Sequence, residues 1–66
     1  MEIIINGEAR QLDAATDLAQ LIETMSLAGK RIAVERNGEI VPRSQFASQQ
    51  LREGDRLEIV VAVGGG

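Results

Sequence analysis

Few side chains in this sequence have the chemistry of a reactive site. The 66 residues include no Cys, His, Trp or Tyr, and Lys30 is the single lysine. These absences exclude Ser-His and Cys-His nucleophiles, metal sites built from thiolates or imidazoles, and histidine acid-base catalysis. Carboxylates, arginines, hydroxyls and the chain ends remain as the candidate groups.

The carboxylates fall at turns, strand ends and outward strand positions, where we expect them to be solvated rather than catalytic. They include Glu2, Glu8, Asp13, Glu35, Glu39, Glu53 and Asp55. The turn Glu53-Gly54-Asp55 is too short for a calcium loop, so we predict no metal site. Arg36, Arg43 and Arg56 are expected to form surface ion pairs worth about 0 to 1 kcal/mol, with no role beyond solubility and orientation against partners.

Three consecutive glycines, Gly64, Gly65 and Gly66, are the one feature that folding does not require. Glycine adds nothing to a core and loses more backbone entropy on folding than any other residue. A chain without Cβ atoms can thread a narrow channel, and three or four extended residues reach about 10 to 14 Å. The glycines directly follow a strand pattern and nothing follows them. We therefore predict a flexible tail that delivers the Gly66 carboxylate into another protein's active site, rather than a frayed end.

Length and composition predict one small domain with an aliphatic core. A chain this short buries only about 60% of its unfolded surface, which counts against a self-contained enzyme. The hydrophobic fraction is 44%, with Phe46 as the single aromatic residue. The net charge is −3 without a basic run, so we predict no nucleic acid partner. No apolar run approaches the roughly 18 residues that span a bilayer, and we expect no membrane partner and a cytoplasmic protein.

Two hairpins and one helix are predicted before the last strand. Asn6-Gly7 and Asn37-Gly38 are strong type I′ turn signals, so they predict hairpins over residues 3–12 and 32–41. Apolar residues at helical spacing predict an amphipathic helix over about residues 17–27; they are Leu18, Leu21, Ile22 and Met25. We expect Thr16 to cap its start and Gly29 to end it.

The last predicted strand begins near Arg56 and alternates in period two. Leu57, Ile59, Val61 and Val63 share one face, and because this strand is the most apolar we expect it at the centre of the sheet. Residues 43–51 are better explained by a helical turn packed on the core than by a strand.

Together the elements predict an α+β fold, the ubiquitin-like β-grasp, with a mixed sheet of four to five strands and one main helix on one face. The domain is expected over residues 1–63 and the tail over 64–66.

The sheet face away from the helix is predicted to carry a partner-binding patch. Period two places Ile4, Val60 and Ala62 on this open face, with acidic residues around them. An apolar centre with a charged rim is typical of docking surfaces.

Four features of the chain form a combination typical of one family: the Asn6-Gly7 hairpin, residues 34–43 (VERNGEIVPR), the turn at 53–55 and the ending at 61–66 (VAVGGG). In these features the sequence resembles the ThiS family, the small sulfur carrier proteins of thiamine biosynthesis. It covers the whole chain. The small subunit of molybdopterin synthase and ubiquitin-related modifiers share a diglycine end, but the run at 37–43 and the VGGG ending favour the thiamine family. Lys30 as the only lysine argues against a chain-forming modifier.

The resemblance implies a protein cosubstrate rather than an enzyme. An E1-like adenylyltransferase would adenylate Gly66 with ATP and magnesium that belong to that partner, and the carrier itself would bind no cofactor. Sulfur from a donor such as a cysteine desulfurase system would then displace AMP. The thiocarboxylate on Gly66 would deliver sulfur to thiazole synthase, with Gly64 and Gly65 threading the channel.

Two alternatives to this function stay open. One is a molybdopterin-synthase-type sulfur carrier, which has the same chemistry in another pathway. The other is a non-reactive β-grasp adaptor with an incidental tail. An independent catalyst is disfavoured, because the sequence predicts neither a deep pocket nor catalytic residues.

Overall fold

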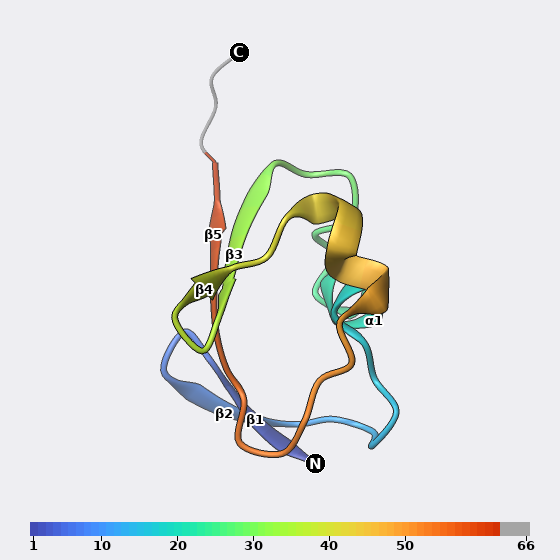
Figure 1. Ribbon diagram of the computed structural model, residues 1–66, viewed down its shortest axis with the longest axis vertical. Helices are drawn as coiled ribbons and strands as arrows, with labels where there is room; N and C mark the ends of the chain where they lie inside the picture. The colour runs from blue at the N-terminus through green and yellow to red at the C-terminus, as the bar shows by residue number, and fades with distance from the viewer. Residues whose placement is uncertain (63–66) are drawn as a thin grey trace.

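A five-stranded mixed sheet in the order β2-β1-β5-β3-β4 forms one layer, and the helices cover one of its faces (Figure 1). The structure is a computed structural model that describes residues 1–62 of the chain. Its strands are β1 (Glu2–Ile5), β2 (Glu8–Gln11), β3 (Ile32–Arg36), β4 (Glu39–Ile40) and β5 (Arg56–Val61). Its helices are α1 (Leu18–Thr24) and the 3₁₀ helix η1 (Arg43–Ser48). The predicted mixed sheet with one main helix is confirmed.

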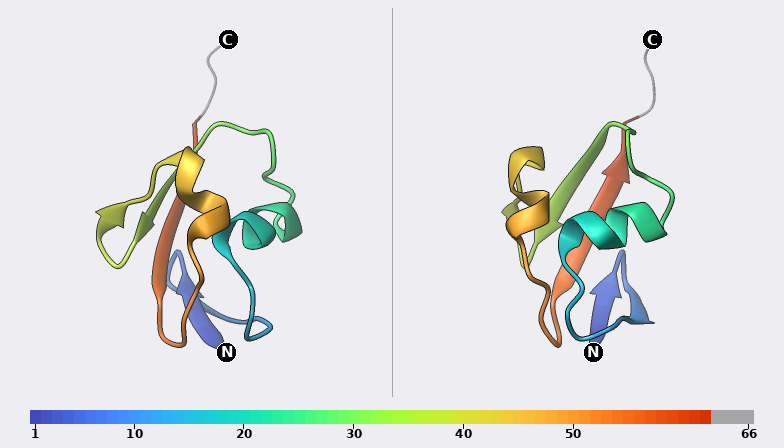
Figure 2. Two further views of the ribbon diagram at one scale, coloured as in Figure 1. Left: turned by 45° about the vertical axis from the view of Figure 1, so that its right-hand side comes forward. Right: turned by 90° about the vertical axis from the view of Figure 1, so that its right-hand side faces the viewer.

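The last strand occupies the centre of the sheet, as its apolar sequence predicts. β5 runs parallel to β1, with Ile5 opposite Leu57, and antiparallel to β3, with Val34 opposite Ile59. The two further views show β5 extending past α1 (Figure 2). The last residues of the central strand therefore lie beyond the main helix.

Both predicted hairpin turns form. Asn6 and Gly7 have φ of 49° and 84°, and Asn37 and Gly38 have φ of 51° and 86°. Asparagine and glycine tolerate these left-handed values, which the type I′ turn requires at both central positions. β4 has only two residues and stops before Pro42, which cannot donate to a ladder.

The helix boundaries differ from the prediction. Asp17, not Thr16, is the N-cap: its carboxylate accepts from the Gln20 backbone amide at 2.8 Å, and its own amide donates to the Gln20 side chain at 2.9 Å. This capping box satisfies two amides at once, whereas the Thr16 hydroxyl donates back to the Asp13 carbonyl.

The helix also ends before the predicted Gly29. Ser26 takes the left-handed conformation at φ 61°. Its amide donates to Glu23 and the Leu27 amide donates to Ile22, both at 3.0 Å, which is a Schellman motif. Gly29 has a φ of 81° in the turn that follows. The motif places Leu27 against the core, and this packing favours a helix that ends before Ser26.

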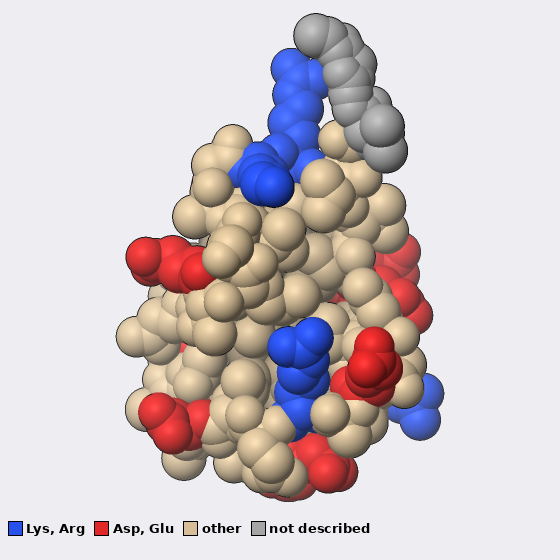
Figure 3. Space-filling model, turned by 180° about the vertical axis from the view of Figure 1, so that it is seen from behind, with Lys and Arg blue, Asp and Glu red and all other residues tan. Residues whose placement is uncertain are grey.

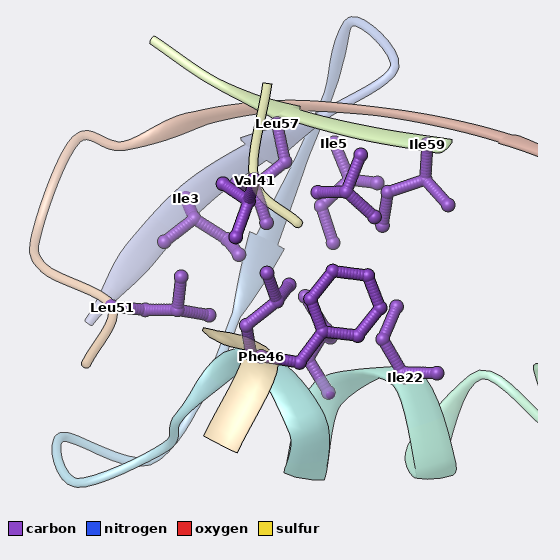
Figure 4. Close-up of a cluster of buried hydrophobic side chains, with 11 residues drawn as sticks. Ile3, Ile5, Ile22, Val41, Phe46, Leu51, Leu57 and Ile59 are labelled. Atoms are coloured by element: carbon purple, nitrogen blue, oxygen red, sulfur yellow. The ribbon is translucent and has the colours of Figure 1, made fainter. Parts of the chain in front are cut away.

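An aliphatic core fills the space between the sheet and the helices (Figure 4). Its buried members are Ile3, Ile5, Leu18, Leu21, Ile22, Val34, Val41, Phe46, Leu51, Leu57 and Ile59. Val61 was predicted to share the inward face, but its side chain is 42% exposed because β5 extends past α1 at this point. Val63, predicted to follow it on the same face, lies outside the described residues.

Candidate functional site

The predicted reactive group lies outside the residues that the structure describes. Gly64, Gly65 and Gly66, and the domain boundary at residue 63, therefore remain predictions. The last described residue is Ala62, whose amide donates to the Arg31 carbonyl at 2.8 Å. The chain is thus held against the sheet as far as Ala62, and the candidate site is the surface around this end of β5.

An asparagine side chain extends the pairing of β5 beyond the end of β1. The Asn6 Nδ2 donates to the Ile59 carbonyl at 3.1 Å, and the Ile59 amide donates to the Asn6 Oδ1 at 2.8 Å. The side-chain amide therefore stands in for one more residue of β1. It fixes the middle of β5 in the sheet.

A polar network holds the start of β5. The Asp55 carboxylate accepts from Arg36 Nε at 3.0 Å, Asn37 Nδ2 at 3.0 Å and the Arg52 backbone amide at 2.8 Å. Arg36 also donates to the Gln49 side chain and the Gln50 carbonyl. Asp55 is only 7% exposed. The predictions that Asp55 is solvated and that Arg36 forms only a weak surface pair are wrong, because the turn folds Asp55 inward onto Arg36.

This network shifts the acid strength of Asp55. Burial alone raises the pKa of a carboxyl group, because it penalises the charged form. Hydrogen bonds from Asn37, the Arg52 amide and Arg36, together with the Arg36 charge, outweigh burial and hold the pKa of Asp55 below its ordinary value. The group is therefore an ionised structural anchor rather than a proton donor.

The predicted patch is divided by the strand register. Val60 is 62% exposed and Ala62 is also exposed, so both lie open on the face away from the helices. Ile4 is half-buried and lies opposite Arg56, at the other end of β5. The structure thus brings Val60 and Ala62 together and leaves Ile4 away from them. The docking role of all three stays a prediction.

A shallow hollow of about 280 Å³ adjoins Val60 and Ala62. We call it the exit hollow; it is lined by Arg31, Ile32, Ala33, Arg43, Val60 and Ala62. Arg43 reaches it from the start of η1, and its Nη2 donates to the Lys30 carbonyl. Sequence reasoning gave Arg31 no role, because only the fold brings Arg31 and Arg43, twelve positions apart, to one concave surface.

Charge is unevenly spread over the surface. Seen from behind, basic side chains stand together at the top of the view, and acidic side chains lie along the sides and toward the bottom, where further basic side chains stand among them (Figure 3). Within residues 1–62, no group of three or more acidic side chains is placed to hold a metal ion. In the same part of the chain, no helix is both long and apolar enough to cross a membrane.

A family model for the ThiS family matches residues 3–66. The chain belongs to the ThiS family. The match takes in both hairpins, β5 and the three terminal glycines, so it covers the elements on which the sequence resemblance rests. The predicted family membership is confirmed.

Individual relatives of the ThiS-family chain agree with this assignment. The sulfur carrier protein ThiS of Escherichia coli K12 is 30% identical over 66 residues, with full coverage of both chains. The crystal structure of a thiamine biosynthesis protein (ThiS) from Geobacter metallireducens matches over both whole chains, with a TM-score of 0.83 and 28% identity. The β-grasp fold is thereby confirmed.

A thiazole synthase is also similar to this chain. The protein of that name from Paramagnetospirillum magneticum is 42% identical over 66 residues, which is all of this chain. The chain spans only 20% of that relative's length. A ThiS-like segment therefore occurs inside a much longer protein named for thiazole synthesis.

Proposed function

We propose that this chain is a sulfur carrier of thiamine biosynthesis and that its working group is the Gly66 carboxylate. The observation that carries the proposal is the extent of the family match, which runs through Gly66. The fold supports it, because the central strand β5 leads directly toward the glycines. The protein acts as a cosubstrate in the cytoplasm, and its partners supply the catalysis.

The chemistry begins with a poor electrophile. A carboxylate does not react with sulfur nucleophiles at neutral pH, so a Gly66 oxygen first attacks the α-phosphate of ATP and pyrophosphate leaves. A sulfur nucleophile at the oxidation level of sulfide then attacks the carbonyl carbon and expels AMP. The product is a thiocarboxylate on Gly66. ATP and magnesium are bound by an E1-like adenylating enzyme. A cysteine desulfurase system provides the sulfur as a persulfide, and two electrons from a thiol reductant bring this sulfur to the oxidation level of sulfide.

Thiazole synthase is the proposed acceptor of the sulfur. The similarity to a protein named thiazole synthase supports this partner, because a ThiS-like segment is part of the same polypeptide there. Gly64 and Gly65 form the thread that reaches the acceptor's active site, since a backbone without Cβ atoms fits a narrow channel. Val60 and Ala62 dock against the partner at the base of that thread.

Intact mass spectrometry tests the proposal. The chain is incubated with the E1-like adenylating enzyme of the same organism, magnesium ATP and a sulfide source. The expected result is a mass increase equal to the difference between sulfur and oxygen. A variant that lacks Gly66 is the matched control and should gain no mass, because its shortened end no longer reaches the adenylation site.

The acceptor is identified in a second step. Loaded carrier is mixed with thiazole synthase or with the large subunit of molybdopterin synthase, and loss of the added mass reports sulfur transfer. Transfer to the molybdopterin enzyme alone would move the protein to the other pathway. An unchanged mass with an adenylating enzyme that loads its own carrier would favour the non-reactive adaptor.

A further inference from the structure

The exit hollow combines two guanidinium groups with an apolar floor. Arg31 immediately precedes β3 and Arg43 begins η1, and both line the hollow together with Val60 and Ala62. Val60 is 62% exposed although it is aliphatic. An apolar surface rimmed by cations is suited to an occupant that carries both aliphatic and acidic groups.

Neither arginine of the hollow forms an ion pair with the part of the chain that the structure describes. Within residues 1–62 the ion pair formed is between Arg36 and Asp55, away from the hollow. Arg43 donates to the Lys30 carbonyl, which is a neutral acceptor. The chain as a whole carries a net charge of −3, so a local cationic surface here opposes the overall charge. Such a reversal orients an approaching partner.

We propose that the exit hollow binds a carboxylate-bearing segment of the enzyme that receives the tail. Aliphatic side chains of that segment would cover Val60 and Ala62, and its carboxylates would pair with Arg31 and Arg43. The identity of the enzymes rests on the proposed function, whereas the charge recognition rests on the hollow itself. A phosphate would also pair with guanidinium groups, but the apolar floor offers it no further hydrogen-bond donors, whereas it suits the aliphatic side chains of a protein segment.

The acidic residues farther along the sheet fix the direction of binding. Glu35 and Glu58 lie directly opposite each other in the pairing of β3 with β5, on the same open face as Val60. A like-charged pair in this position opposes the sheet's stability and repels an acidic partner. The partner's carboxylates are therefore directed to the end of β5, next to the residues that lead into the tail.

Charge reversal tests the proposal. The variant Arg31→Glu/Arg43→Glu is compared with Arg10→Glu/Arg52→Glu, which changes the net charge equally at exposed positions outside the hollow. Dissociation constants are measured with the adenylating enzyme and with thiazole synthase, at low and high salt. We expect the hollow variant to bind at least one enzyme about 10-fold to 100-fold more weakly, with a reduced salt dependence. The control should stay within about 2-fold.

A second variant separates loss of binding from loss of the fold. Arg43→Glu removes the bond to Lys30, so Arg31→Glu is also measured alone, with circular dichroism to confirm the fold. Affinities for both enzymes that equal the control's would overturn the proposal, as would failure of the wild-type chain to bind either enzyme. Binding of magnesium ATP to the isolated carrier that is lost in Arg31→Glu/Arg43→Glu would also overturn the proposal, because the hollow would then be a phosphate site. Wild-type sulfur loading is read by mass, so failure of the proposed function is seen separately.

Discussion

The two ends of β5 are held in very different ways. At its start, Asp55 and Arg56 are tied by side-chain bonds to Arg36 and Asn37. At its end, Val60 and Val61 pair with β3 and the Ala62 amide donates to Arg31, but these residues lie beyond the register of β1, which stops at Leu57. The first end is buried and polar, and the second is exposed and apolar. The comparison shows how a small domain fixes the start of its last strand while leaving the far end of that strand exposed.

The largest predicted effect comes from removing the anchor. Asp55→Ala deletes the acceptor for Arg36, Asn37 and the Arg52 amide, and leaves these groups without their partner. We expect the free energy of unfolding to fall by about 3 kcal/mol. Because single cores of this size supply only about 3 to 5 kcal/mol, much of the protein should unfold.

Urea denaturation followed by circular dichroism measures this loss. Asp13→Ala is the matched control, since Asp13 is exposed and its side chain makes no hydrogen bond within residues 1–62. The control should change stability by less than about 0.5 kcal/mol. Equal unfolding midpoints for the two variants would mean that the network does not anchor β5.

Acid should weaken the same anchor. Burial raises the pKa of Asp55, but the bonds from Asn37, Arg52 and Arg36 lower it by more, so the pKa is lowered in the folded protein. A lowered folded pKa gives stability that is fully present above the unfolded value of about 3.9 and is lost as pH falls through the folded value. The stability difference between wild type and Asp55→Asn should therefore shrink below about pH 4. A difference that stays constant down to pH 2 would contradict this account.

A smaller loss is expected at the middle of β5. Asn6→Gly keeps a residue that accepts φ of 49° but removes both bonds to Ile59. We expect a cost of about 1 to 2 kcal/mol in the free energy of unfolding. Asn6→Asp keeps the acceptor for the Ile59 amide but turns a carboxylate oxygen toward the Ile59 carbonyl, so it should also be less stable than wild type. Wild-type stability in Asn6→Gly would show that the side-chain pairing is incidental.

Much of the fold could be predicted from the sequence because its signals are local. The Asn-Gly turns act through their own φ angles, and α1 through the spacing of its apolar residues. The anchor could not be predicted, because Arg36 and Asp55 are 19 positions apart and meet only when β3 pairs with β5. The helix stop at Ser26 depends likewise on the packing of Leu27.

The candidate site divides in the same way. The glycine tail is visible in composition, since no folding requirement explains it. Val60 and Ala62 follow from strand alternation, but their separation from Ile4 depends on the register of two parallel strands that are far apart in sequence. The exit hollow depends on Arg31 and Arg43 meeting across the edge of the sheet. Side chains that act together only through tertiary contacts leave no pattern in the sequence.

A substitution at the open end of β5 is predicted to have the smallest effect on folding and yet to abolish function. Val60 is 62% exposed, so Val60→Asp should cost less than about 1 kcal/mol in stability and yet abolish thiocarboxylate formation. Ile40→Asp is the matched control, because Ile40 is 68% exposed on β4 and lies outside the exit hollow. It should load sulfur normally. A folded Val60→Asp protein that gains sulfur at the wild-type rate would remove Val60 from the docking surface, and the open end of β5 would then be only a support for the tail.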